Sequence, residues 1–262
     1  MGINETTSEI KSIKPRVDFE MGGKGKGQLK ELKVLKTFNP NIKVLVSVGG
    51  LSEGSVKFSE MARSSAKRTA FVNSLDIKSV FDPEGWLLTV HITAKRSVIN
   101  LGYDLRSISE IVDYINLSAL EYHGPWDRTT GIMAPLRSNN ENNVEYMVNY
   151  TISKRASPSK ILLGLPTYGF SYIVEDEIKR GQYLGLNSDQ TFKSKWTNKR
   201  GTKLVNKYKL GGIMLWSLDM DDFLGLCHNQ KYPLLSAVTE YLEQQDNSYI
   251  PKKKVVVETY GK

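Results

Sequence analysis

Cysteine, histidine and long apolar runs are scarce in this chain of 262 residues. Cys227 is the only cysteine, so no disulfide can form within the chain. Three histidines are present, and His123 has no second ligand at the spacing of a zinc site, so we expect no metal and no cofactor. No stretch reaches the roughly 18 consecutive apolar residues of a membrane span, and the first residues lack the apolar segment of a secretory signal. We therefore expect neither a disulfide-built scaffold nor a membrane protein.

Basic residues outnumber acidic ones, which gives a formal net charge of +8. A nucleic-acid-binding surface concentrates its positive charge on one element. Here the lysines and arginines are spread over the predicted helices, with one cluster at Lys252, Lys253 and Lys254. We therefore interpret the charge as solvation of helix faces and expect no nucleic-acid partner.

Apolar runs alternate with amphipathic, helix-like stretches along the chain. Parallel strands read as continuous apolar runs because helices cover both faces of their sheet, and this alternation favours βαβ units. The predicted fold class is therefore α/β, and the hydrophobic content of 40% is sufficient for a core. The apolar runs are Lys43–Gly50, Leu87–Ala94, Tyr114–His123, Lys160–Gly169 and Gly211–Asp219, and the helical stretches are Ser59–Leu75, Ser107–Asp113, Asn143–Ala156 and Leu234–Gln244.

The wording and order of these runs resemble the family 18 glycoside hydrolases, the chitinases and chitinase-like lectins, especially the insect type. The most specific pieces are SVGG at 47–50, LGLPTYG at 163–169 and WSLDMDDF at 216–223. The resemblance implies a TIM-type (β/α)8 barrel, of which about five strands are recognisable here. We expect an incomplete barrel over residues 1–245 and a flexible tail over residues 246–262.

The acidic motif of that family, D-G-x-D-x-D-x-E, does not occur in the sequence. The resemblance implies a gap after Leu75, because Asp76–Ser79 leads directly to Phe81–Trp86, the turn before the next barrel strand. In the family the glutamate protonates the glycosidic oxygen while the acetamido group of the sugar attacks the anomeric carbon. Loss of a general acid typically costs about 10² to 10⁴-fold in rate. We therefore expect no catalytic residue in this chain.

Other acidic groups in the sequence imitate that motif. Asp18 and Glu20 alternate correctly, but no apolar strand precedes them. The group Asp219, Asp221 and Asp222 follows an apolar run without a glutamate, and short acidic side chains at such a place cap loops and helices. We expect neither group to be catalytic.

The residues expected to bind sugar follow from the resemblance. Trp216 matches the tryptophan at the floor of the central subsite, Trp126 matches one at the cleft edge, and Tyr168 matches the tyrosine of PTYG. Glu121 replaces an aspartate and could accept a hydrogen bond from a sugar hydroxyl. Aromatic faces suit the apolar faces of pyranose rings, although large aromatic residues also fill protein cores. Phe170 replaces an arginine, which removes one polar contact of the family.

Three functional hypotheses stay open at this level. The first is a chitinase-like protein that binds chitin or N-acetylglucosamine oligomers without hydrolysing them. The second is an incomplete version of an active secreted chitinase. The third is a signalling protein like the growth-factor relatives of insect chitinases. The resemblance also implies an extracellular location and makes Cys227 the remaining half of a family disulfide.

Overall fold

The chain forms two compact units in the computed structural model, which describes residues 2–27, 34, 37–38, 40, 45–46, 56–74, 87–127, 131–170, 201–226, 229–244 and 254–258. The first unit comprises Met1–Val90 and Val112–Tyr114. The second comprises His91–Ile111 and Ile115–Lys262. All four residues expected to bind sugar belong to the second unit, so the candidate site lies within this unit.

The first unit combines a small hairpin with short helices and the start of a parallel sheet. Its strand β3 pairs in parallel with the first residues of β4. The expected helix at 59–75 is two helices, α3 and α4, because the Ser64 hydroxyl accepts a hydrogen bond from the amide of Lys67 (3.3 Å) and so caps the second helix. The elements are β1 (Gly2–Ile3), β2 (Ile10–Lys11), α1 (Pro15–Asp18), η1 (Met21–Gly23), β3 (Leu45–Val46), α3 (Val56–Arg63), α4 (Ser65–Ser74) and the first part of β4 (Leu87–Thr93), a strand whose residues from His91 onward belong to the second unit.

Asp18 lies at the end of helix α1, and its carboxylate accepts a hydrogen bond from the Ser12 hydroxyl. Phe19, between the two imitating acids, is exposed. These residues are therefore not part of a strand.

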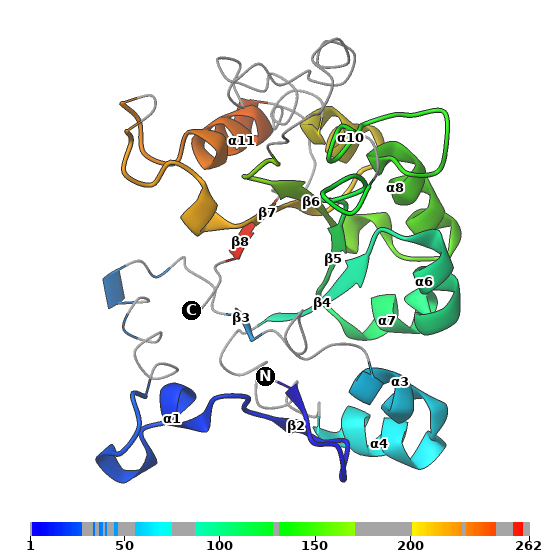
Figure 1. The fold of residues 1–262 in the computed structure, drawn as a ribbon, viewed down its shortest axis with the longest axis vertical. Helices are drawn as coiled ribbons and strands as arrows, with labels where there is room; N and C mark the ends of the chain where they lie inside the picture. The colour runs from blue at the N-terminus through cyan, green and yellow to red at the C-terminus, as the bar shows by residue number, and fades with distance from the viewer. Residues whose placement is uncertain are drawn as a thin grey trace. The chain divides into compact units, whose positions relative to one another are not determined.

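The second unit is a parallel sheet in which β4, β5, β6, β7 and β8 are successive neighbours (Figure 1). Each described pairing from β5 to β8 is parallel. Every one of the predicted apolar runs contains one of the strands β3 to β7, so the α/β class and the strand positions are confirmed. Within the described residues the row of strands is open beyond β8. The further strand bounds are β5 (Tyr114–Ser118), β6 (Ile161–Pro166), β7 (Gly212–Trp216) and β8 (Lys254–Glu258).

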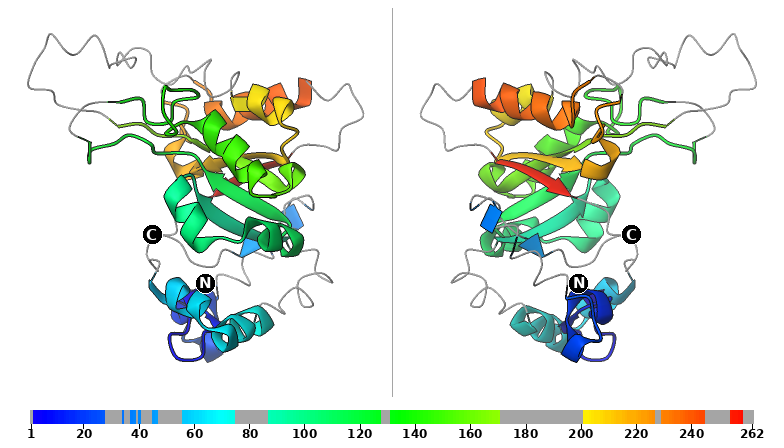
Figure 2. Two further views of the ribbon diagram at one scale, coloured as in Figure 1. Left: turned by 90° about the vertical axis from the view of Figure 1, so that its right-hand side faces the viewer. Right: turned by 90° about the vertical axis from the view of Figure 1, so that its left-hand side faces the viewer.

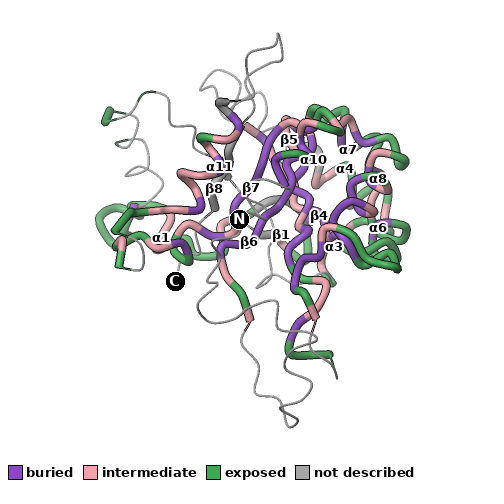
Figure 3. The backbone as a smooth tube through the Cα atoms, turned by 90° about the horizontal axis from the view of Figure 1, so that it is seen from above, coloured by how far each residue is buried: buried purple, intermediate pink, exposed green. Residues whose placement is uncertain are grey.

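Helices cover the outer side of this row of strands, as Figures 1 and 2 show. The strands β6 and β7 are buried along almost their whole length (Figure 3), as expected for central strands of a parallel sheet that helices cover. Burial of each Leu, Ile or Met side chain here contributes roughly 1.5–3 kcal/mol. The helices are α6 (Arg96–Gly102), α7 (Leu105–Ile111), α8 (Val144–Ser153), α10 (Thr202–Lys207) and α11 (Pro233–Gln244), with the 3₁₀ turns η2 (Pro158–Lys160) and η5 (Leu218–Met220).

The C-terminal residues differ from the expected flexible tail at one place. Lys254–Glu258 form strand β8, which pairs in parallel with β7. The sequence showed only a short apolar patch there, and its partner strand lies about forty residues upstream, so local composition did not reveal the pairing. The other residues of 246–262 lie outside the described part of the chain.

Asp221 caps helix α11 from a distant loop. Its buried carboxylate accepts hydrogen bonds from the amides of Leu234 (3.4 Å) and Leu235 (3.0 Å), which belong to the first turn of α11. A carboxylate at a helix N-terminus satisfies free amides and interacts favourably with the helix dipole. The capping role expected for this acidic group is confirmed for Asp221.

Replacement of Asp221 by alanine is expected to lower the free energy of unfolding by about 1–3 kcal/mol, because two amides lose a charged acceptor. Urea denaturation followed by circular dichroism measures the change. Asp222→Ala serves as the control: it removes a carboxylate that accepts the amide of Leu226 (2.9 Å) at an exposed position, and its loss is expected to be smaller. Equal losses in both variants would contradict the capping role.

Several sequence predictions fall outside the described residues. These are the junction at 75–86 and Cys227. The described helices include none with both the length and the apolar character to cross a bilayer.

Candidate functional site

The candidate site lies where the strands of the second unit end. In a parallel sheet the carboxyl ends of the strands meet at one edge, which is where barrel enzymes place their functional residues. Ser118 ends β5, Trp216 ends β7, and Tyr168 follows β6 by two residues. His91 lies on β4, two residues before that strand ends.

His91 connects three of these strands. Its Nδ1 lies 3.0 Å from the Ser118 hydroxyl, and its ring meets the Trp216 ring edge to face at 6.0 Å between centroids. In a flat sheet β4 and β7 would be about 14 Å apart, three strand spacings of about 4.8 Å. The sheet therefore curves, and His91 and Trp216 point into the same concave space.

Tyr168 and Glu121 form a polar pair at the strand ends. The Tyr168 hydroxyl donates a hydrogen bond to Oε1 of Glu121. Partial burial, and secondly the hydrogen bond and charge of Glu121, raise the pKa of Tyr168, so this hydroxyl stays protonated at neutral pH. The pair places a carboxylate acceptor and a tyrosine ring next to each other.

The turn after β6 holds Tyr168 beside Trp216. Pro166 is the register partner of Trp216 in the parallel ladder. The Thr167 amide donates to the carbonyl of Trp216 (2.9 Å), and the Thr167 hydroxyl donates to the carbonyl of Ser217 (2.7 Å). Because two main-chain carbonyls anchor Thr167, the next residue, Tyr168, starts from a fixed backbone position.

Phe170 links Tyr168 to Trp126. The Phe170 ring lies edge to face with the Tyr168 ring at 6.0 Å and with the Trp126 ring at 5.9 Å. Trp126 is 58% exposed, so it does not fill the core. Three aromatic rings therefore follow one another from the strand ends outward, and such edge-to-face pairs each contribute about 0.5–1.5 kcal/mol beyond area burial.

The structure connects the four residues that the sequence analysis predicted to bind sugar. Tyr168 contacts Glu121 directly and reaches Trp126 through Phe170. Trp216 joins this group through the β6–β7 ladder and contacts His91. Sequence reasoning did not assign His91 or Phe170 to the site. The histidine in the otherwise apolar run LLTVHITA was the available signal, whereas Phe170 was interpreted only as the loss of an arginine.

His123, which was considered as a metal ligand, lies in the loop after β5. His123 Nδ1 lies 3.0 Å from Oδ2 of Asp127, and the imidazole is partly exposed. His123 is therefore hydrogen-bonded, and it does not lie in the core. Within the described part of the chain, no three His, Cys, Asp or Glu side chains are grouped so that they could hold a metal ion.

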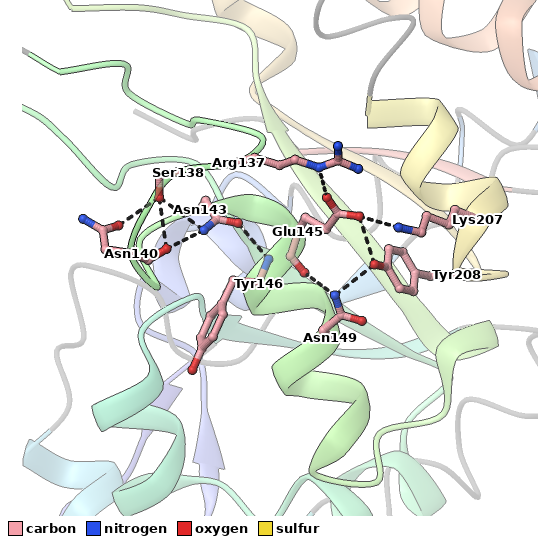
Figure 4. A network of polar contacts seen from close by, with 9 residues as sticks. All are labelled: Arg137, Ser138, Asn140, Asn143, Glu145, Tyr146, Asn149, Lys207 and Tyr208. Carbon is pink, nitrogen blue, oxygen red and sulfur yellow. Dashed lines mark hydrogen bonds and ion pairs between the residues drawn. The ribbon is translucent and has the colours of Figure 1, made fainter.

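A second polar cluster surrounds Glu145 on helix α8 (Figure 4). The carboxylate accepts hydrogen bonds from Arg137 Nε, from Lys207 Nζ (2.6 Å) and from the Tyr208 hydroxyl (3.0 Å). The Asn149 amide nitrogen donates to the same tyrosine oxygen at 2.9 Å. The hydrogen bond from Arg137, opposed by burial and assisted by Lys207 and Tyr208, lowers the pKa of Glu145 to about 2. This cluster joins the loop before α8 to the end of α10 and is structural.

Known chitinases are similar to this chain in sequence and in fold. Residues 2–77 and 75–221 match the profile of "Glycosyl hydrolases family 18". The chain is 26% identical to Probable chitinase 2 of Drosophila melanogaster over 91% of this chain and 72% of that protein. The Ostrinia furnacalis Group IV chitinase, solved in complex with allosamidin, superposes with a TM-score of 0.73 at 25% identity, covering 93% of this chain and 89% of that one.

A non-enzymatic relative is also similar. Human YKL-39, described as a pseudo-chitinase with retained chitooligosaccharide binding properties, superposes with a TM-score of 0.63 at 25% identity. The alignment covers 82% of this chain and 85% of that one. The curved parallel sheet with aromatic side chains at its carboxyl ends is therefore that of a family 18 barrel. The chain belongs to glycosyl hydrolase family 18.

Proposed function

We propose that this protein binds chitin or N-acetylglucosamine oligomers at the strand ends of the second unit and does not hydrolyse them. The observation that carries this proposal is the hydrogen bond between Tyr168 and Glu121. Tyr168 follows β6 by two residues, and the last residue of β6 is the ladder partner of Trp216, which ends β7. This arrangement combines aromatic faces for sugar rings with a carboxylate for a sugar hydroxyl. Binding of allosamidin by the Ostrinia enzyme and of chitooligosaccharides by YKL-39 supports this ligand class.

Each residue has a distinct role in this proposal. The ring of Trp216 stacks on a pyranose ring at the base of the site, and Glu121 accepts a hydrogen bond from a sugar hydroxyl. Trp126, which is largely exposed, stacks on a second sugar farther out. Phe170 and Tyr168 support this outer ring by edge contacts. The site therefore suits a linear oligomer better than a single sugar.

The non-hydrolytic part of the proposal rests on the sequence. The motif that supplies the proton donor in the family does not occur in the chain. Without that donor the leaving oxygen is not activated, which removes about 10² to 10⁴-fold of the rate. Release of a fluorophore from a fluorogenic chitobioside above the buffer rate would support the alternative, an active chitinase, and refute this part of the proposal.

Replacement of Trp216 by alanine is expected to weaken chitooligosaccharide binding about 10-fold or more, because loss of a stacking face costs about 1–3 kcal/mol. Isothermal titration calorimetry with chitopentaose measures the change. Trp216→Phe keeps an aromatic face and is expected to retain most of the affinity. Leu101→Ala, which alters a side chain that is 91% exposed on α6, is the control and should leave binding unchanged.

A site elsewhere would produce a different pattern. If Trp216→Ala bound the oligomer as tightly as the unmodified protein, the strand ends would not be the binding site. If the unmodified protein bound no chitooligosaccharide but bound cell surfaces, the signalling hypothesis would replace this one. We also propose an extracellular location from the family relationship, which detection of the protein in the culture medium of its own cells would test.

A further inference from the structure

Strand β8 lies beside β7 at the end of the row of strands, which is the position where a barrel would close. It pairs with β7 over its full length, from Gly212 opposite Lys254 to Trp216 opposite Glu258. By resemblance, β7 is the last strand of the barrel. In a closed eight-stranded parallel barrel, the neighbour beyond the last strand is the first strand. Here residues near the C-terminus lie in that place, beside β7 (Figure 1).

The edge of β7 requires a partner for physical reasons. With β8 paired to β7, Ile213, Met214 and Leu215 are between 0% and 1% exposed, so water has little access to this part of the strand. A buried strand edge with unpaired amides and carbonyls is unfavourable, because these groups lose their hydrogen bonds to water without replacement. A strand that pairs with this edge removes the cost.

The chain between β7 and β8 has the form that such a pairing needs. Parallel strands must be joined by a crossover, usually through a helix. Helix α11 (Pro233–Gln244) lies between the two strands in the sequence, so β7, α11 and β8 make one βαβ unit. The run Val255–Val257 has the high strand propensity that an added strand requires.

We infer that residues 254–258 fill, within the same molecule, the sheet position that the first strand holds in a closed barrel, and that they thereby position Trp216. The edge of β7 is in this sense a strand-binding surface, and its occupant is the C-terminal segment of the chain itself. Trp216 is the final pair of the ladder, so its backbone is held on both sides, by Pro166 of β6 and by Glu258 of β8. The effect on sugar binding rests on the proposed function, whereas the effect on the β7 edge does not.

Proline substitutions in the full-length chain test the inference. In a parallel edge strand, alternate residues direct their amides toward the neighbour, and the others direct them away. Of Val255→Pro and Val256→Pro, one therefore removes a hydrogen bond to β7, and the other is its matched control. The variant that removes the hydrogen bond is expected to accelerate amide hydrogen exchange in residues 212–216 by about 10-fold or more. The other is expected to change it less.

Further measurements separate the possible outcomes. Unchanged exchange of the amides of Met147 and Val148 in α8 shows that both variants fold. Unchanged exchange in residues 212–216 in both folded variants would overturn the inference. Protection that rises with protein concentration would also overturn it, because the strand would then come from a second copy. If the unmodified protein binds no chitooligosaccharide but the proline variant exposes β7, the proposed function fails and the strand assignment stands.

Discussion

Replacement of Gly164 by alanine is expected to lower the free energy of unfolding by about 3 kcal/mol, because added atoms in a full core force the backbone apart. Gly164 is in the middle of β6, where a Cβ atom would lie 2.6 Å from the carbonyl oxygen of Leu117 on β5. It would also lie 3.1 Å from the end of the Met214 side chain. The main-chain oxygen cannot move without breaking the β5–β6 ladder.

Gly102→Ala is the matched control for this substitution. Gly102 ends helix α6, and a Cβ atom there would meet nothing within 4 Å. Its replacement is expected to leave stability unchanged or to raise it slightly, since alanine is the better helix former. Chemical denaturation of both variants measures the difference. A loss at Gly164 no larger than at Gly102 would show that β5 and β6 are not packed as described.

Replacement of Glu145 by alanine is expected to cost about 1–3 kcal/mol of unfolding free energy, because Lys207, Tyr208 and Arg137 lose a shared charged acceptor. The side chain of Glu145 is 11% exposed, whereas those of Arg137 and Lys207 are 70% and 53% exposed and regain water after the substitution, which limits the loss. Glu141→Ala is the control. Glu141 pairs with Arg96 at 3.2 Å with both side chains 49% exposed, and such surface pairs contribute about 0–1 kcal/mol.

The same carboxylate predicts a dependence of stability on pH. The hydrogen bond from Arg137 holds its pKa at about 2 in the folded chain, against an ordinary value of 4.5. A lowered pKa stabilises the folded state above the unfolded pKa, and the contribution is lost as the pH falls through the folded value. We expect the unmodified protein to lose roughly 1–2 kcal/mol more than Glu145→Gln between about pH 5 and pH 3. Parallel pH dependences for the two proteins would contradict this role of Glu145.

The strands and the family were predictable from the sequence because both are local properties. A continuous apolar run such as KILLGLPTYG indicates a buried strand by itself, and the PTYG at its end matches a sequence motif of the family. Asp221 was likewise predicted as a cap from its place after a strand. The division of the helix at 59–75 was missed, because Ser64 in a helical stretch gives only a weak signal for a cap.

The site could be predicted only in part. Tyr168, Glu121, Trp126 and Trp216 were named from motifs, and the structure joins them through hydrogen bonds, ring contacts and the β6–β7 ladder. Their binding role stays a proposal. Phe170 was judged by the arginine that it replaces. Its contacts with two other rings depend on how the segments after β5 and β6 fold back. The sequence near Phe170 does not predict this arrangement.

The sequence by itself determined the α/β class, the family and the positions of the strands, because hydrophobic periodicity and short motifs act over a few residues. Only the tertiary structure decided that His91 meets Trp216 and that Lys254–Glu258 pair with β7. Both depend on the curvature and neighbour order of the sheet. These are set by packing and hydrogen bonding between residues far apart in the chain, which sequence composition near either residue does not specify.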